Sequence, residues 1–239
     1  PPPPPPFQAE DGIRDKQICL VGSEMCIRDS LGWSSVGAYY AEQEAAEQKY
    51  GQQYANYLKQ DIAALATNKD AITTGSRLFS TYCTQCHGSD AGGGPGFPNL
   101  RDGAWLWGGE VAQIKQTISA GRMGAMPAWG AVLGDDGVKN VTAYVMSLSG
   151  RKTAGDLDAG KEKFQQLCVA CHGAEAQGNI ALGAPDLTDE AWVYGSSRRS
   201  IEKSIKEGRT GRMPAFGDFL GEGKVHLLTA YVYSLSVEN

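Results

Sequence analysis

The stretch "CTQCHG", Cys83–Gly88, returns as "CVACHG" at Cys168–Gly173. In each copy two cysteines stand three positions apart, and a histidine directly follows the second one. Four of the six cysteines of the chain belong to these two copies. Each copy brings two thiols and one imidazole onto a single turn of backbone, a set of groups that binds metals or attaches a cofactor.

The sequence around the two motifs is repeated as well. Gly75 and Gly160 align at an offset of 85 residues, and Pro98 and Pro185 align at 87, because the second copy has a loop two residues longer. The 87-residue offset then holds for Trp105/Trp192, Trp107/Tyr194, Ile114/Ile201, Gly121/Gly208, Arg122/Arg209 and "TAYVMSLS"/"TAYVYSLS". The chain therefore contains a tandem duplication of a module of about 80 residues.

Each module shows helical patterns and no strand pattern. The sequence predicts a first helix over 73–82 (157–167 in the second copy) and a middle helix that Gly121 ends. A last helix carries Val138, Val141, Val145 and Leu148 on one face, and its twin carries Val225, Leu228, Val232 and Leu235. The fold class is therefore predicted to be all-α.

We predict five segments along the chain. Residues 1–30 look like translated adapter sequence and are left out of the fold, together with Cys19 and Cys26. The others are a helical lead-in over 31–70, a domain over 71–149, a linker over 150–156 and a second domain over 157–237. No run reaches the roughly 20 apolar residues of a membrane helix.

Three chemistries use two cysteines spaced in this way. A structural zinc site needs four ligands, and each module has only two cysteines and one histidine of its own. A thioredoxin-like dithiol belongs beside a parallel sheet, which the sequence does not predict. Covalent attachment of haem c uses both thiols for thioether bonds and the histidine as an iron ligand. We predict two haems, attached at Cys83 and Cys86 and at Cys168 and Cys171, which also fill a core otherwise thin for its length.

Iron held by His87 or His172 on one face needs a ligand on the other face. A methionine thioether is such a ligand, and "GRMGAMPAWG" (121–130) aligns with "GRTGRMPAFG" (208–217). Met126 and Met213 coincide, whereas Met123 aligns with a threonine and is predicted to be a surface or packing residue. We predict Met126 with His87 and Met213 with His172; packing in an ordinary core is the alternative for both methionines.

A few further residues have a predicted place. Trp105, Trp107, Trp192 and Tyr194 are expected to line the haem pockets. Arg122 and Arg209 could pair with haem propionates or be solvated. Tyr144 and Tyr231 are expected to pack the last helix against the first, over Gly75 and Gly160. His226 aligns with Lys139 and is predicted to face solvent.

An ordered set of short motifs resembles one family in particular. The motifs are "LGWSSVGAYYAEQ", "CHGSDAGGGPGFPNL", "WLWGG", "MPAWG", "CHGAEAQGN", "ALGAPDLTDEAWVYG", "MPAFG" and "VHLLTAYVYSLS". Together they resemble the di-haem subunit III of cbb3-type cytochrome c oxidases over about Leu31 to Val237.

The resemblance implies two tandem class I cytochrome c domains, each wrapped around a covalent haem, with His87, Met126, His172 and Met213 as iron ligands. It implies a redox subunit that is not catalytic by itself. Electrons would come from a soluble cytochrome c and pass to the mono-haem and catalytic subunits, which reduce oxygen and pump protons. The family has an N-terminal membrane helix, expected upstream of this sequence, and works at the periplasmic face of the bacterial inner membrane.

Two other functions remain open at this stage. A free soluble di-haem shuttle of the cytochrome c4 kind shares the duplication and the ligands. A di-haem peroxidase needs one iron with an available position and a larger chain, and both Met-Pro loops speak against it. The net charge of −5 argues against a nucleic-acid partner.

Overall fold

The computed structural model describes residues 34–237, so the expectation for residues 1–30, with Cys19 and Cys26, lies outside the described part. The chain divides into two compact units, of which one ends at Gln53 and the other begins at Tyr54. The first unit holds most of helix α3 (Ser35–Leu58), whose side chains there are almost all exposed. Among the helices within 34–237, none combines the length and the apolar character needed to cross a membrane.

The helix that leads into each motif begins at a side-chain cap. Helix α5 (Lys69–Tyr82) starts four residues before the predicted position, because the Asn68 side chain accepts hydrogen bonds from the first free backbone N–H groups. Its counterpart α9 (Leu157–Leu167) has the predicted bounds, and Asp156 caps it by accepting from the Ala159 N–H at 3.0 Å. Both first helices therefore end directly at a motif.

Except for α4, which belongs to the lead-in, the remaining helices follow the same order in the two repeats, 71–149 and 157–237. In the described chain they are α4 (Ile62–Leu65), α6 (Thr84–His87), α7 (Val111–Ala120), α8 (Gly130–Leu148), α10 (Val169–His172), α11 (Arg198–Glu207), α12 (Gly217–Leu220) and α13 (Glu222–Val237). Gly121 ends α7 as predicted, with a positive φ of 70° and its N–H bonded to the Thr117 carbonyl. Gly134 interrupts α8, and the equivalent Gly221 of the second repeat separates α12 from α13.

A two-stranded ribbon corrects the prediction of a purely α-helical fold. Strand β1 (Arg122–Met126) pairs antiparallel with β2 (Arg209–Met213), and Gly124 lies opposite Gly211. Neither segment alternates apolar and polar residues, so its sequence carries no strand signal. The strands form because equivalent segments of the two repeats meet and bond to each other. The protein is mostly helical with this one ribbon in the described residues.

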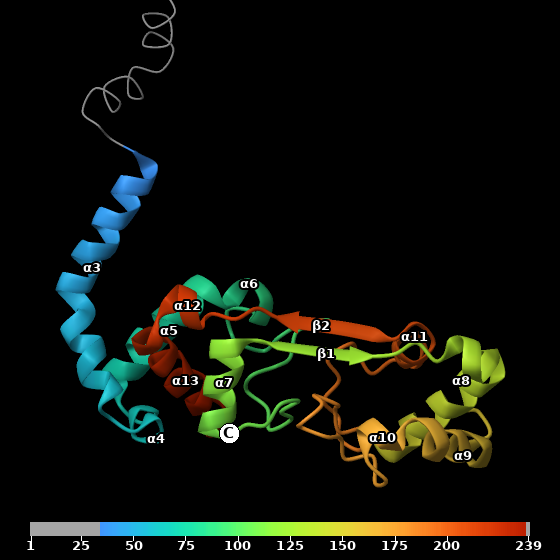
Figure 1. Ribbon diagram of the computed structural model, residues 1–239. Helices are drawn as coiled ribbons and strands as arrows, with labels where there is room; N and C mark the ends of the chain where they lie inside the picture. Colours follow the sequence, from blue (N-terminus) through green and yellow to red (C-terminus); the bar gives the residue numbers. More distant parts are fainter. Residues whose placement is uncertain (1–33, 238–239) are drawn as a thin grey trace, which may run out of the picture. The chain divides into compact units, whose positions relative to one another are not determined.

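Two of the three hydrophobic cores of the second unit combine helices of the two repeats as follows. In the first half, α5 and α7 of the first repeat pack with α12 and α13 of the second repeat. In the second half, α9 and α11 of the second repeat pack with α8 of the first repeat. The ribbon joins the halves, with α5, α7 and α13 beyond one end and α8, α9 and α11 beyond the other (Figure 1). The last helix of each repeat has therefore changed places with that of the other.

The predicted contact between a glycine and a tyrosine shows this exchange in detail. Gly75 on α5 is so close to α13 that an added Cβ would lie 2.7 Å from the Cβ of Tyr231. Gly160 on α9 would meet the Cβ of Tyr144 on α8 at 2.9 Å. Both glycines allow close helix crossings, and the tyrosine comes from the other repeat in each case. Packing within one repeat was the expectation, and the structure differs because the equivalent helix ends are alike enough to substitute for each other.

His226 is buried rather than solvent-facing, so that prediction was wrong. Only 6% of the residue is exposed, and its Nε2 lies 3.0 Å from the Gln60 carbonyl oxygen. The lead-in covers this face of α13, where Tyr57, Ile62, Leu65, Ala71, Leu227 and Ala230 form a third apolar cluster. Lys139, which aligns with His226, is not covered by a lead-in and remains exposed. Alignment of the repeats could not reveal this difference, because only one repeat has a lead-in.

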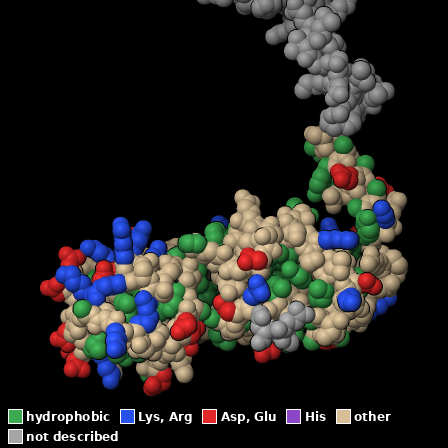
Figure 2. Space-filling view, turned by 180° about the vertical axis from the view of Figure 1, so that it is seen from behind, with side chains coloured by type: hydrophobic (Ala, Val, Ile, Leu, Met, Phe, Trp, Pro, Cys, Tyr) green, Lys and Arg blue, Asp and Glu red, His purple; other side chains and the backbone are tan. Residues whose placement is uncertain are grey.

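Charged side chains concentrate at the end that carries α8, α9 and α11 (Figure 2). The ion pairs there include Arg198–Glu202 at 2.8 Å and Lys203–Glu207 at 3.8 Å, both one helical turn apart on α11. Such exposed pairs add about 0.3–0.5 kcal/mol each at most. The stability of this half therefore rests on its apolar core.

Replacing either close-packed glycine should destabilise the protein. We expect Gly75→Ala or Gly160→Ala to lower the free energy of unfolding by about 1–2 kcal/mol, because the new methyl group overpacks a helix crossing. Thermal unfolding of the haem-loaded protein, followed by circular dichroism, measures the change. Gly103→Ala is the control, since an added Cβ there meets nothing within 4 Å. Equal melting temperatures for all three variants and the parent would contradict this packing.

Candidate haem-binding sites

Each motif forms one tight turn at the end of a first helix. Cys83 ends α5, and its carbonyl accepts from the N–H groups of Cys86 at 3.1 Å and His87 at 2.9 Å. Cys168 does the same for Cys171 and His172, with the same distances. The first cysteine of each motif is half-buried and the second is exposed, and all four thiols are free. The turn therefore directs two thiols and one imidazole to a common region in both repeats.

The histidine of each motif is fixed by one backbone hydrogen bond. His87 Nδ1 lies 3.1 Å from the Pro98 carbonyl oxygen, and His172 Nδ1 lies 3.1 Å from that of Pro185. A carbonyl can only accept, so Nδ1 carries the proton and donates it. Nε2 then keeps its lone pair free for a metal. Burial lowers the pKa of both histidines, against the opposite effect of the carbonyls, so both imidazoles are neutral at pH 7.

Burial keeps the thiol of the first cysteine of each motif, Cys83 or Cys168, protonated. Burial raises the pKa of Cys83 to about 11, and the nearby Cys86 adds to this effect. Burial likewise raises the pKa of Cys168 to about 11, with Cys171 contributing. Thiolates are the usual form of cysteine in zinc sites. In the absence of a bound group, the first cysteine of each motif therefore carries a neutral thiol.

The two methionines predicted as iron ligands end the two ribbon strands. Met126 is the last residue of β1 and Met213 the last residue of β2, and both are half-buried. Met123 is 72% exposed, which confirms its assignment as a surface residue. The half-buried positions alternate along each strand, so each ligand candidate shares a face with the arginine at the start of its own strand.

The structure brings each methionine to the other repeat rather than to its own. Met126 packs against the core of the second half, together with Cys168 and Val169. Met213 packs against the core of the first half, together with Cys83. The predicted pairing of Met126 with His87 and of Met213 with His172 therefore does not match the packing. The cause is the exchanged position of residues 122–148 and 209–237, which follow Gly121 and Gly208.

Arg122 and Arg209, which were expected to pair with haem propionates or to be solvated, each contact a hydroxyl group and an aromatic ring. Arg122 Nε donates to Thr117 Oγ1 at 2.9 Å, and its guanidinium lies 5.0 Å from the centre of the Trp107 ring. Arg209 repeats this arrangement with Ser204 Oγ at 2.8 Å and with the Tyr194 ring at 4.4 Å. These contacts place a fixed positive charge at the start of each strand, opposite the methionine at the end of the other strand.

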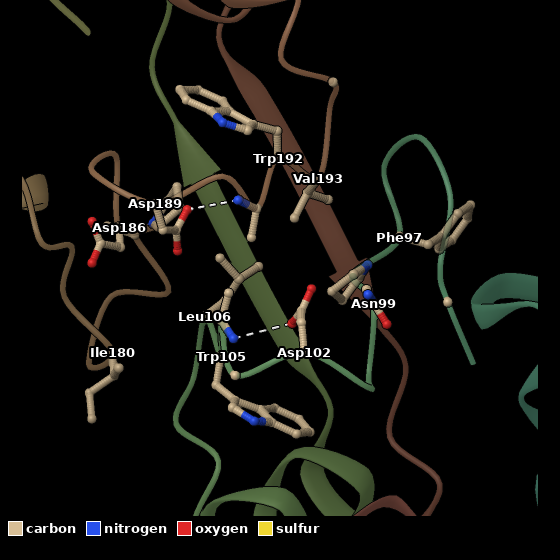
Figure 3. Close-up of a pocket in the computed structure, with 18 of the residues that line it drawn as sticks. Phe97, Asn99, Asp102, Trp105, Leu106, Ile180, Asp186, Asp189, Trp192 and Val193 are labelled. Carbon is tan, nitrogen blue, oxygen red and sulfur yellow. Dashed lines mark hydrogen bonds between the residues drawn. The ribbon is translucent and has the colours of Figure 1, made fainter. Parts of the chain in front are cut away.

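A pocket of about 470 Å³ lies between loops of the two repeats. Figure 3 shows Trp105 and Trp192 on opposite sides of it. None of the cysteines, histidines and methionines of the candidate haem sites lines this pocket, so the prediction that the two tryptophans line the haem pockets stays a prediction. Pro98 and Pro185, whose carbonyls hold the histidines, also line it. The pocket is therefore built from equivalent loops that face each other.

Three carboxylates line this pocket, those of Asp102, Asp186 and Asp189, and the sequence reasoning gave none of them a role. Asp102 accepts from the Ala104 N–H at 3.2 Å, and Asp189 accepts from the Ala191 N–H at 2.9 Å (Figure 3). Burial raises the pKa of Asp189, and the charges of Asp186 and Asp102 add to this. The repeat offset of 87 relates Asp102 to Asp189 and could have revealed them. It also relates the two histidine-binding prolines, which had been aligned without a role.

The residues present fit a covalently attached haem. Within residues 34–237, no three His, Cys, Asp or Glu side chains are grouped so that they could hold a metal ion. The donors that do occur are a thiol pair for attachment, a neutral imidazole with Nε2 free, and a half-buried thioether in each half. This combination is the one that haem c requires.

Comparison with known proteins agrees with these sites. The family model for subunit III of cbb3-type cytochrome c oxidase matches twice, at residues 70–145 and 155–232. The cbb3-type cytochrome c oxidase subunit CcoP of Rubrivivax gelatinosus is 44% identical over 213 residues, which cover 87% of this chain and 69% of that protein. The subunit FixP of Sinorhizobium medicae is 39% identical over 219 residues, covering 86% and 76%. With both repeats matched and such relatives, the chain belongs to the family of subunit III of cbb3-type cytochrome c oxidases.

Proposed function

We propose that this protein is a di-haem c electron-transfer subunit of a cbb3-type terminal oxidase. Two haems are attached through thioether bonds, one in each repeat, and each iron has one imidazole and one thioether ligand. The attachment residues are Cys83, Cys86, Cys168 and Cys171, and the iron ligands are His87, His172, Met126 and Met213.

The observation that carries the proposal is the pair of buried histidines with Nδ1 engaged. Each Pro–His hydrogen bond orients Nε2 and increases its basicity, which is what an axial iron ligand needs. Met126 and Met213 would be the thioether ligands of the two irons. With an imidazole and a thioether bound to each iron, no position would remain for a substrate, so the protein would transfer electrons and not be catalytic by itself.

The residues around each site affect the reduction potential of the iron. A bound haem supplies the one-electron couple of its iron. The thioether of Met126 or Met213 favours the reduced state relative to a second nitrogen ligand. The apolar cores disfavour the extra positive charge of the oxidised state. Both effects raise the reduction potential, which suits a carrier near the high-potential end of a respiratory chain.

The relatives support an oxidase complex as the place where the protein works. Proteins named as subunits of cbb3-type oxidases at 37–44% identity favour an oxidase subunit over a free di-haem shuttle. Electrons enter from a soluble cytochrome c and leave to the mono-haem and catalytic subunits. This transfer takes place at the periplasmic face of the bacterial inner membrane. Exposed Cys86 and Cys171 place one attachment point of each haem at the surface, where a partner can approach.

Reconstitution separates the two functions. Haem-loaded protein added to a cbb3-type oxidase depleted of subunit III should co-elute with it and restore oxygen consumption with reduced cytochrome c. A free shuttle would stay in the unbound fraction. That outcome, with no gain in oxygen consumption, would contradict the oxidase assignment.

Haem counting tests the cofactor directly. We expect a pyridine haemochrome assay, combined with intact mass, to give two covalent haems per chain. The variant with Cys83→Ala and Cys86→Ala should keep one, and the variant with Cys168→Ala and Cys171→Ala should also keep one. Two haems remaining in either variant would refute attachment at these thiols.

Removing a methionine ligand should change one haem only. We expect Met126→Ala or Met213→Ala to lower the potential of one haem by on the order of 100 mV, a modest part of the range that axial ligands span. The reduced variants should also bind carbon monoxide, one equivalent each. Potentiometric and carbon monoxide titrations measure both effects.

The matched control is Met123→Ala, which removes an exposed thioether from the same strand. This variant and the parent should bind no carbon monoxide. Binding by the parent protein would instead favour a peroxidase, which needs an open iron.

A further inference from the structure

Two half-buried arginines of the ribbon carry positive charges that have no acidic partner in the described residues. We infer that these charges raise the reduction potentials of the haems: Arg122 acts on the haem ligated by Met213, and Arg209 acts on the haem ligated by Met126. This inference rests on the proposed methionine ligands and goes beyond them, because it assigns a role in the redox chemistry to side chains that are not iron ligands.

The register of the ribbon places each arginine beside a methionine of the other strand. Arg122 pairs with Met213, and Arg209 pairs with Met126. Strands β1 and β2 lie side by side (Figure 1), and residues directly opposite each other in such a pair have Cβ atoms about 5 Å apart. All four residues occupy half-buried positions of their strands. Each arginine and its methionine therefore share the less exposed face of the ribbon.

Arg122 is held in place by neutral groups. Its Nε donates to Thr117 Oγ1 at 2.9 Å, and its Nη2 donates to Gln116 Oε1 at 3.2 Å. The Thr117 hydroxyl donates its own proton to the Gln113 carbonyl at 2.8 Å, so its oxygen is available to accept. The guanidinium also lies 5.0 Å from the centre of the Trp107 ring, which adds a cation–π contact. These contacts fix the position of the charge without cancelling it.

Arg209 is held in the same way in the other half. Its Nε donates to Ser204 Oγ at 2.8 Å, and its Nη2 donates to the Ser200 carbonyl at 3.3 Å. The Ser204 hydroxyl donates to that carbonyl as well, at 2.9 Å. The guanidinium lies 4.4 Å from the centre of the Tyr194 ring. The three partners stand at the repeat offset of 87 from their counterparts around the first arginine, so the duplication supplies both arrangements.

The surroundings of both arginines preserve a full positive charge. Among the residues that the structure describes, no ion pair includes Arg122 or Arg209. Thr117 lies in the last turn of α7 and Ser204 in the last turn of α11, where the carbonyl end of a helix favours a cation. A guanidinium remains charged in proteins. Each haem site therefore has a fixed cation beside the methionine proposed as its ligand.

A fixed cation beside an iron ligand changes the balance between the two oxidation states. Ferric haem carries one more positive charge than ferrous haem, so a nearby cation destabilises the oxidised form and raises the reduction potential. Salt screens exposed charges strongly and partly buried charges much less. Arg212 is the contrasting case, because it directly precedes Met213 in β2 but is exposed. We therefore expect Arg122, and not Arg212, to act on the haem that Met213 ligates.

Potentiometric titration of one haem at a time tests the assignment. In haem-loaded Met126→Ala protein, carbon monoxide holds the opened iron reduced, so the other haem titrates alone in a one-electron step. Adding Arg122→Gln should lower the midpoint of this step. At the potential where the haem was half reduced before, the ratio of reduced to oxidised haem should fall on the order of tenfold, the scale of one charge in a partly buried setting. Adding Arg209→Gln instead should leave the midpoint unchanged.

The Met213→Ala background gives the opposite expectation. There Arg209→Gln should lower the midpoint of the remaining haem, and Arg122→Gln should leave it unchanged. If each arginine acts on the haem ligated by the methionine of its own strand, or if both act equally on both haems, the inference is wrong.

Two further variants separate charge from structure. Arg122→Lys keeps the charge but loses the planar fork of donors, so it should retain most of the midpoint of the Met126→Ala background. A midpoint as low as that of Arg122→Gln would assign the shift to the lost hydrogen bonds and overturn the inference. Arg212→Gln, the matched control, removes the same charge from the exposed face and should give a clearly smaller shift that high salt abolishes. A shift as large as that of Arg122→Gln would contradict the role of the half-buried charge.

Carbon monoxide binding separates the inference from the function on which it rests. The single variants Arg122→Gln and Arg209→Gln should bind none, which shows that both methionines remain bound to iron. Binding by these variants would mean that the arginines hold the methionines in place, and the inference would fail. If Met126→Ala and Met213→Ala each open one haem but the arginine variants shift no midpoint, only the inference fails. If neither methionine variant opens a haem, the ligands of the proposed function fail, and the inference fails with them.

Discussion

The hydrogen bond from a buried histidine to a proline carbonyl is the contact on which the two candidate haem sites depend. It joins the motif at the end of the first helix to the loop that follows, His87 to Pro98 and His172 to Pro185, at 3.1 Å in both repeats. It fixes the tautomer, leaves Nε2 free, and positions the loop that carries the pocket walls. Burial acts in the same direction by keeping the imidazole neutral. The tautomer of the histidine and the position of the loop that follows thus depend on this one hydrogen bond, and the neutral state of the imidazole depends on its burial.

The exchanged segments give the duplication a structural consequence. Two copies of a module that are similar at their helix contacts can dock each other's last helix nearly as well as their own. What the exchange adds is the ribbon of β1 and β2, together with the backbone bonds of Trp129 and Phe216 to the opposite middle helix. These contacts unite the two repeats into one body. An electron carrier built in this way has two sites whose relative positions are set by shared backbone.

Much of the site could be predicted from the sequence because it depends on local patterns. The motifs, the helix ends at Gly121 and Gly208, and the distinction between Met126 and Met123 all come from short stretches and their repetition. His226 shows where this approach fails, since its burial depends on the lead-in that contacts only one of two aligned positions. The ribbon was missed for a related reason: a five-residue, glycine-containing segment becomes a strand only when its partner is beside it.

The sequence by itself determined the chemistry of this protein: the thiol pairs, the histidines, the methionines and the membership of an oxidase family. These depend on residue type and spacing, which are local properties. Only the tertiary structure decided which last helix packs against which first helix. Because Tyr144 and Tyr231 carry the same side chain at equivalent positions, either can pack over Gly75 or Gly160, and the sequence has no means to choose between them. The choice is made by long-range contacts, above all the pairing of β1 with β2, which exist only in the folded chain.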